Sequence, residues 1–251
     1  MDPLGRPGRR LRRRLVCCCL PLLLLAVLPA AVAAAPLKQD WRIEPFEWHG
    51  SLGAGRVLAV RNPYGDVRAR RADGATTAVY AAMQRHRSDP REWTISIAES
   101  ADGLAVEVVL AGGAVPAADW APRRVDLTVY VPAGARLRAE TVDGLIEAKR
   151  LGGDVEARSV GGEIVVTTTG SVDARSEAGR IRYSFLDPQW VGSARLVTRS
   201  GDITLTLPRG ANVDLAVQTR GETSTAVLGA GGSRVAVESE SGKVEVQQIR
   251  S

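Results

Sequence analysis

Acidic and basic side chains recur at a fixed spacing in the second half of the sequence, where they could do chemistry together. Asp154 and Glu156 precede Asp173, and the phrase "VEARS" that contains Arg158 returns as "VDARS" with Arg175. Two carboxylates about 5 Å apart would suit a retaining glycosidase, and a row of carboxylates could bind Ca²⁺. A solvated face, on which the arginines balance the acids, explains the same residues without chemistry. We favour the solvated face over the glycosidase and the Ca²⁺ site, and we take its residues as a candidate binding surface.

Histidine and cysteine, which are common in nucleophilic and metal sites, are scarce in this sequence. The two histidines, His49 and His86, lie outside H-E-x-x-H and every other familiar ligand spacing. The three cysteines are all at residues 17–19. The Gly-Gly-x-Gly-x-Asp repeat that binds Ca²⁺ is absent from the sequence. We therefore predict no catalytic residue, no cofactor and no metal site.

Aromatic rings are a second candidate for binding, because flat rings stack on the faces of sugars. The sequence has five tryptophans, and all of them lie outside its regular repeats. Trp190, which lies in an insertion between two repeats, is the best candidate for an exposed contact residue. The alternative is that its ring folds back over the edge of the core, which is the usual fate of a lone tryptophan.

The first residues have the features of an export signal. Six arginines precede an apolar run from Leu15 to about Ala35, which contains the small-residue sequence Ala31-Val32-Ala33. This pattern predicts a secretory signal peptide over residues 1–33. The run is also about long enough to cross a bilayer, so an uncleaved membrane anchor remains an alternative. We expect an N-terminal extension over residues 34–55, one domain over residues 56–251, and a location in the periplasm, the cell envelope or outside the cell.

The positive net charge of the chain belongs to this leader. Residues 1–33 contain six of the 33 basic residues and one of the 28 acidic residues, so the rest of the chain is formally neutral. A formally neutral chain lacks the excess of basic residues that is typical of nucleic-acid-binding proteins, and we predict no nucleic-acid partner. Because every cysteine lies in the leader, the exported part must be held together by its core and its backbone hydrogen bonds.

A repeated motif predicts the strands that would position these charged side chains. The motif is a Ser or Thr, two residues, a Gly, one residue, and then an Ile or Val. Its glycines are separated by 18, 17, 22 and 41 residues. The 22-residue step indicates an insertion, and the 41-residue step indicates two coils with a degenerate copy at Gly221. The five clear copies start at Thr141, Ser159, Ser176, Thr198 and Ser239.

Each glycine of the motif is followed by alternating apolar and polar residues, which is the pattern of a half-buried strand. We expect the glycines to supply the unusual backbone angles of the corners. Short strands that recur at a fixed step can bury their apolar faces by stacking coil on coil. The sequence thus predicts an all-β fold, a single-domain β-solenoid of about 17–18 residues per coil. An antiparallel sandwich is the alternative.

The N-terminal half is less regular and is expected to contain antiparallel strands. The stretches "EWTISIAES" and "GLAVEVVLAGG" read as two strands joined by a turn at Asp102-Gly103. The stretch "TTAVYAAMQRH", from Thr76 to His86, fits either a strand or a short helix.

Several of these phrases together resemble the DUF4097 family of bacterial adhesin-type domains in the cell envelope. They are the opener "NPYGDV", the segment "VDLTVYVPAGARLRAETVDGLIEA" with its Val-Pro-x-Gly turn, and the glycine motifs up to the C-terminus. The resemblance covers about Val57 to Ile249. It implies an all-β, solenoid-like domain that is exported or tethered to a membrane, and it supplies no catalytic residues.

The sequence predicts a non-enzymatic, adhesin-like envelope protein with an extended binding face made of Asp154, Glu156, Arg158, Asp173 and Arg175, together with Trp190. An envelope glycan or an envelope protein is the expected partner, and a membrane would be reached only through an uncleaved leader. Two alternatives stay open. One is a lyase or glycosidase acting on polysaccharide, and the other is a structural or regulatory module that acts through another envelope protein.

Overall fold

The computed structural model describes residues 41–86, 93–111, 124–185 and 187–249, which belong to one compact unit from Lys38 to Ser251. The described part is all-β and contains no helix, so no helix in it could cross a membrane. The expected signal peptide lies outside the described residues and stays a prediction.

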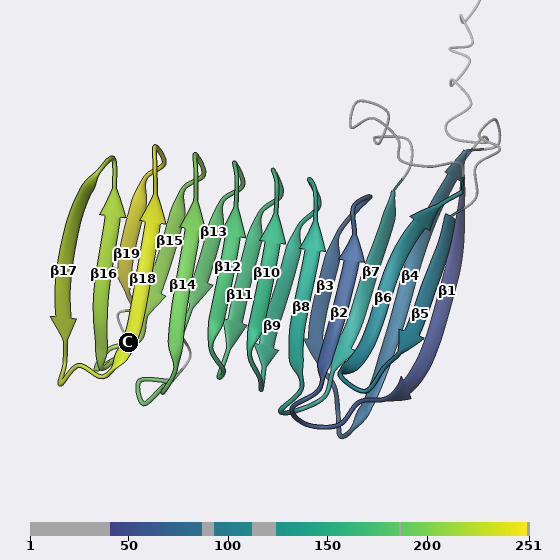
Figure 1. Cartoon of the computed structure of the whole chain (residues 1–251), viewed down its shortest axis with the longest axis horizontal. Coiled ribbons are helices and arrows are strands. Elements are labelled where there is room, and N and C mark those ends of the chain that lie inside the picture. The colour runs from purple at the N-terminus through teal and green to yellow at the C-terminus, as the bar shows by residue number, and fades with distance from the viewer. Residues whose placement is uncertain (1–40, 87–92, 112–123, 186, 250–251) are drawn as a thin grey trace, which may run out of the picture. The chain divides into compact units, whose positions relative to one another are not determined.

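The strands form two large mixed sheets that face each other and are not closed into a barrel (Figure 1). Sheet A has nine strands, in the spatial order β1 (Trp41–Ser51), β4 (Thr76–His86), β7 (Val125–Val131), β3 (Val67–Arg71), β9 (Ile146–Leu151), β11 (Ile164–Thr168), β13 (Ile181–Ser184), β15 (Ile203–Leu207) and β19 (Val244–Gln248). Sheet B has ten strands, in the order β17 (Glu222–Leu228), β16 (Val213–Thr219), β18 (Ser233–Ser239), β14 (Ser193–Thr198), β12 (Val172–Ser176), β10 (Val155–Ser159), β8 (Arg136–Thr141), β2 (Val57–Asn62), β6 (Gly103–Leu110) and β5 (Trp93–Glu99).

The chain alternates between the two sheets from β8 to β15, and each strand pairs in parallel with the equivalent strand of the next coil. Ile146, Ile164, Ile181 and Ile203 are therefore direct neighbours in sheet A, and each is fully buried. Their column, with the matching column of β8, β10, β12 and β14, forms the core between the sheets. Outside this stretch the strand directions are mixed, so the whole domain is not one uniform coil.

At the N-terminal end the parallel strands β2, β3, β6 and β7 continue the two sheets, and β1, β4 and β5 join them in antiparallel fashion. The segment Thr76–His86, which fitted either a strand or a short helix, is strand β4 and pairs with β1 along its whole length. Strands β5 and β6 form the expected hairpin, with the turn between Ser100 and Gly103. Residues 41–51 of the expected extension form strand β1. The expected division into an extension over residues 34–55 and a domain over residues 56–251 stays a prediction.

The expectation of two coils between Gly201 and Gly242 is wrong. Strand β15 pairs directly with β19, and β14 pairs directly with β18, so the 41-residue step makes a single coil. The extra residues form an antiparallel hairpin, β16–β17, which continues sheet B beyond β18. Gly221 lies at the turn of this hairpin with a φ of 79°, and it is no copy of the coil corner.

The repeat glycines also have a different role from the expected one. Gly144, Gly162, Gly179, Gly201 and Gly242 all have ordinary negative or extended backbone angles. A Cβ atom at Gly162 would lie 1.9 Å from the carbonyl oxygen of Gly144, and a Cβ at Gly179 would lie 2.0 Å from that of Gly162. These glycines are required because successive corners approach each other too closely for a side chain.

The Ser or Thr of the motif joins these corners by hydrogen bonds. In the β10–β11 corner, the Ser159 hydroxyl donates to the carbonyl of Val142 in the preceding coil at 3.0 Å and accepts from the Gly162 N–H at 2.9 Å. Ser176 makes the equivalent contacts with the Val160 carbonyl and the Gly179 N–H, and Ser239 donates to the Gly201 carbonyl and accepts from the Gly242 N–H. The Ser or Thr and the Gly of the repeated motif therefore hold successive corners together.

Candidate functional site

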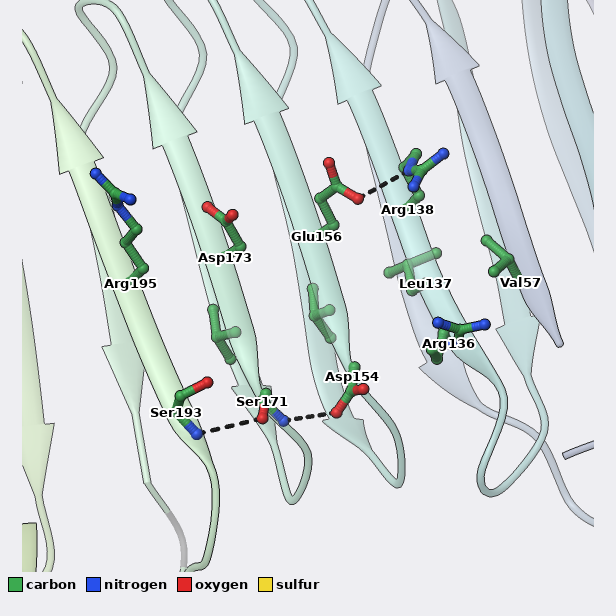
Figure 2. A pocket seen from close by; sticks show the side chains of 12 residues that line it. Val57, Arg136, Leu137, Arg138, Asp154, Glu156, Ser171, Asp173, Ser193 and Arg195 are labelled. Carbon is green, nitrogen blue, oxygen red and sulfur yellow. Dashed lines mark hydrogen bonds and ion pairs between the residues drawn. The ribbon is translucent and has the colours of Figure 1, made fainter. Parts of the chain in front are cut away.

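A shallow groove of about 470 Å³ crosses the outer face of sheet B over strands β8, β10, β12 and β14, and we call it the sheet B groove (Figure 2). Apolar residues that are buried in the core, such as Leu137 and Val155, also lie along it. Its polar lining consists of Arg136, Arg138, Asp154, Glu156, Ser171, Asp173, Ser193 and Arg195.

Parallel pairing places four charged residues of this groove in one row. Arg138 lies beside Glu156, Glu156 beside Asp173, and Asp173 beside Arg195. They come from four successive strands, so neighbours along the row are about 4.8 Å apart in the backbone. All four occupy the positions that alternate with buried residues such as Ala157, and their side chains therefore point outward.

The two carboxylates of this row are held by arginines. Glu156 accepts a hydrogen bond from Arg138 Nε at 2.8 Å and forms an ion pair with Arg158 at 2.6 Å. Asp173 binds both Nε and Nη2 of Arg175, at 2.8 and 2.7 Å. The hydrogen bonds to Asp173 raise the pKa of Arg175 above its ordinary value. Arg195 at the end of the row forms an ion pair with Glu238 of β18 at 3.2 Å.

A second row lies at the edge of the groove, where the strands of sheet B begin. Asp154 Oδ1 accepts the backbone N–H of Ser171 at 2.8 Å, and the Ser171 hydroxyl accepts the N–H of Ser193 at 3.2 Å (Figure 2). Arg136 stands at the end of this row and donates to the carbonyl of Gly55 at 3.2 Å. Within the described residues Arg136 has no carboxylate partner, so its remaining donors are available to a ligand.

The structure brings most of the predicted site residues together. Asp154, Glu156 and Asp173 line the sheet B groove. Arg158 and Arg175, which are neighbours across β10 and β12, lie one row further along the strands and line an adjoining hollow. These five residues form one continuous polar face on sheet B.

Trp190 does not belong to this face. Its ring is stacked on Phe185, with ring centroids 4.4 Å apart, and only 7% of the residue is exposed. Its Nε1 donates to the carbonyl of Gly170 at 3.1 Å. The tryptophan thus covers an edge of the core, as the alternative interpretation proposed, and its ring cannot stack on a sugar.

Three arginines of the groove, Arg136, Arg138 and Arg195, were not singled out from the sequence. Arg138 and Arg195 lie in the segments "RLRAET" and "SARLVT", which share no obvious phrase with "VEARS". The sequence nevertheless contained a signal for both arginines. Each of them lies between two apolar residues, as Glu156 lies between Val155 and Ala157. Aligning the segments on their apolar residues alone would have put both arginines in the row.

Side chains that could hold a metal ion are not clustered in the described part of the chain. It contains no cluster of three or more His, Cys, Asp or Glu side chains that could hold a metal ion. His49 lies on β1 in sheet A, where its Nε2 is 2.6 Å from Glu47 and its ring packs edge-on against Tyr80. The sheet B groove therefore offers hydrogen-bond donors and acceptors at the regular spacing of the strands, an arrangement suited to binding.

No protein-family model matches the chain, and no curated protein matches it either. Solved structures with a similar arrangement include a "putative cell adhesion protein" from Clostridium sporogenes, with a TM-score of 0.44 and 10% identity, over 82% of this chain and 100% of that one. A "putative adhesin" from Bacteroides fragilis has a TM-score of 0.29 and 12% identity, over 82% and 97% of the two chains. Another from Parabacteroides distasonis has a TM-score of 0.30 and 12% identity over the same shares. These names describe those proteins and assign no activity to this chain.

Proposed function

We propose that the protein is an exported, non-enzymatic binding protein of the cell envelope, adhesin-like in the sense of the DUF4097 family. In this proposal the stretch from β8 to β15 acts as a β-solenoid, whose rigid stack holds the sheet B groove in shape. The observation that carries the proposal is the row Arg138, Glu156, Asp173 and Arg195, in which four strands present one polar side chain each at a constant spacing.

An extended glycan is the ligand class that fits this groove best. A polysaccharide chain repeats its hydroxyl groups along its length, and a row with one polar side chain per strand repeats its donors and acceptors every 4.8 Å or so. The charges of the row are already balanced by neighbours on the same face, which favours hydrogen bonding to hydroxyls over binding of a highly charged polymer. Arg136 would add one donor for a carboxylate of an acidic sugar.

The alternative of a polysaccharide-cleaving enzyme receives less support. A retaining glycosidase needs one carboxyl group that donates a proton and one that attacks, and both must reach the scissile bond. Glu156 is bound by two arginines, and Asp173 is bound on both oxygens by Arg175. Two carboxylates held by guanidinium groups are suited to a fixed hydrogen-bonding surface.

The proposal is tested by binding of purified neutral and acidic envelope polysaccharides, measured by calorimetry on wild-type protein and on the variant Arg138→Ala. Loss of a charged hydrogen bond to the ligand should weaken binding about tenfold or more. Arg182→Ala is the matched control. Its side chain is 51% exposed against 53% for Arg138, and it makes the same kind of ion pair at 2.8 Å, with Glu163 just before β11 of sheet A.

Three results would overturn the proposal. Equal losses in both variants would show that the sheet B groove is not the binding surface. Release of new reducing ends from any polysaccharide would favour the enzyme. Failure to bind any polysaccharide, combined with groove-dependent capture of an envelope protein, would favour a module that acts through a protein partner.

A further inference from the structure

One coil of the stack is a residue longer than the coil that follows it. The corner glycines are 18 residues apart from Gly144 to Gly162 and 17 residues apart from Gly162 to Gly179. The extra residue lies in sheet A, because β9 has six residues and its neighbour β11 has five, whereas β10 and β12 both have five. The shorter coil shows that the stack can be built without this residue.

The extra residue forms a β-bulge at the end of β9. Lys149 and Arg150 of β9 lie opposite the single residue Thr167 of β11, because the register of the two strands shifts there. Both side chains are exposed, so the alternation of buried and exposed residues is interrupted. Arg150 has a φ of 54°, in the left-handed region that is unfavourable for a residue with a side chain. Backbone strain of this kind is often kept at functional sites.

The neighbouring strand β3 brings two more cations to the same place. Arg70 pairs with Lys149, so the two backbones are about 4.8 Å apart at this level. Arg71 follows Arg70 and is exposed, as Arg150 follows Lys149. Glu147 is half-buried between these strands and forms ion pairs with both Arg70 and Lys149. Four cations therefore gather around one carboxylate.

Two of these cations, Arg71 and Arg150, have no carboxylate partner within the described residues. Asp73, the next acid along the chain after Arg71, is exposed and forms no ion pair with either arginine there. Elsewhere on the outer face of sheet A the arginines are paired: Arg68 binds Asp66, and Arg182 binds Glu163. The uncompensated charge is therefore local to the ends of β3 and β9.

We propose that Arg71 and Arg150, with Arg70 and Lys149 beside them, form a binding site for a phosphate group on sheet A. A guanidinium group binds the edge of a carboxylate or a phosphate with two parallel hydrogen bonds. A carboxylate has one such edge, whereas a phosphate monoester has three oxygens and can accept from two arginines at once. Its charge of about −1.5 to −2 at pH 7 also matches the two unpaired cations.

This site is separate from the sheet B groove, because it lies on the outer face of the other sheet and uses none of the groove residues. Its existence does not rest on the proposed binding of glycans in that groove. A phosphate monoester occurs on phosphorylated sugars and in the headgroup of phosphatidic acid. Both would be recognised through the same phosphate oxygens, so the experiment has one arm for each source.

The proposal is tested by calorimetric titration of the purified protein with glucose 6-phosphate, and by its co-sedimentation with phosphatidylcholine vesicles with or without phosphatidic acid. Wild-type protein should bind the phosphorylated sugar and not glucose, and binding should strengthen from about pH 5 to about pH 7.5 as the phosphate loses its second proton. Arg150→Ala should weaken binding about tenfold or more. Arg182→Ala is the matched control, because it removes one charge from the same face of sheet A.

Arg150→Gly separates binding from folding. Glycine adopts a φ of 54° without strain, so this variant should bind phosphate as weakly as Arg150→Ala without a lower midpoint of urea unfolding than wild type. Loss of binding in the sugar arm alone would identify a soluble phosphorylated carbohydrate, and loss in the vesicle arm alone would identify a lipid headgroup.

Three results would overturn the phosphate site. They are the absence of binding in both arms, equal losses in Arg150→Ala and Arg182→Ala, and an Arg150→Gly variant that is less stable than wild type but still binds phosphate. The last result would mean that Arg150 is kept for folding. Binding of unphosphorylated polysaccharide, which the sheet B groove is proposed to support, should be unchanged in all three variants.

Discussion

The two corners of each coil differ in how strongly they constrain the sequence. At the glycine corner, where sheet B strands lead into sheet A strands, every coil from β8 onward has the same motif. At the opposite corner, the turns range from the short connection between β11 and β12 to the insertion before β14 and the hairpin before β18. The difference teaches that repetition in this sequence marks the corner where backbones of successive coils are in close contact, and that variation marks the corner where the length of the turn can change.

Contacts at the glycine corner explain its constancy. The hydroxyls of Ser159 and Ser176 reach a carbonyl of the coil before them, and each motif glycine lies directly over another backbone. A change in one corner therefore alters two coils. At the opposite corner, Trp190 and Phe185 fill the space beside β13 with side chains of their own loop. This loop fills its corner with its own side chains and is tied to the neighbouring coils by hydrogen bonds at Gly170 and Ser233, so its length can differ from that of the other turns.

The largest effect is expected at the variable corner, from Trp190→Ala. The ring is buried against Phe185, and its removal leaves a cavity and an unpaired carbonyl at Gly170. We expect the free energy of unfolding in urea to fall by about 4 kcal/mol. Trp190→Phe keeps the stacked ring and loses the N–H, so it should cost only about 1 kcal/mol. Equal losses would show that the hydrogen bond, and not the stacking, holds this loop.

The next largest effect is expected at the constant corner, from Gly162→Ala. The new Cβ would lie 1.9 Å from the Gly144 carbonyl oxygen, so two coils must move apart. We expect a loss of about 3 kcal/mol in urea unfolding. The control is Gly210→Ala, where φ is 80° and the space is open, so only backbone strain of about 1–2 kcal/mol is added. A smaller loss at Gly162 than at Gly210 would contradict the role of close contact.

The features that could be predicted from the sequence are those that follow from local periodicity. Alternation of apolar residues identified the strands, and the nearly identical phrases around Arg158 and Arg175 predicted that these two side chains lie beside each other. Features set by contacts between distant residues were missed or misread. Trp190 donates a hydrogen bond to Gly170 in another coil, and Gly221, which was read as a degenerate copy of the motif, has a φ of 79° and belongs to a hairpin. Arg138 and Arg195 were missed because only their apolar neighbours repeat.

The smallest effect should be a gain, from Tyr183→Phe in the core beside the variable corner. The Tyr183 hydroxyl is buried and has no hydrogen-bond partner among the described residues, and its ring packs edge-on against Phe185. Removing an unpaired buried hydroxyl should stabilise the protein by about 1 kcal/mol at neutral pH.

The same substitution should change how stability depends on alkaline pH. Burial raises the pKa of Tyr183 above the ordinary value of about 10. Above that pH the unfolded chain loses a proton that the folded chain retains, so wild-type stability falls as pH rises through this range. Tyr183→Phe lacks this contribution, and its advantage over wild type in urea unfolding should be larger at about pH 11 than at pH 7. A variant that is less stable than wild type at neutral pH would mean that the Tyr183 hydroxyl has a hydrogen-bond partner in solution. The buried polar groups at the variable corner would then be satisfied, as they are at the glycine corner.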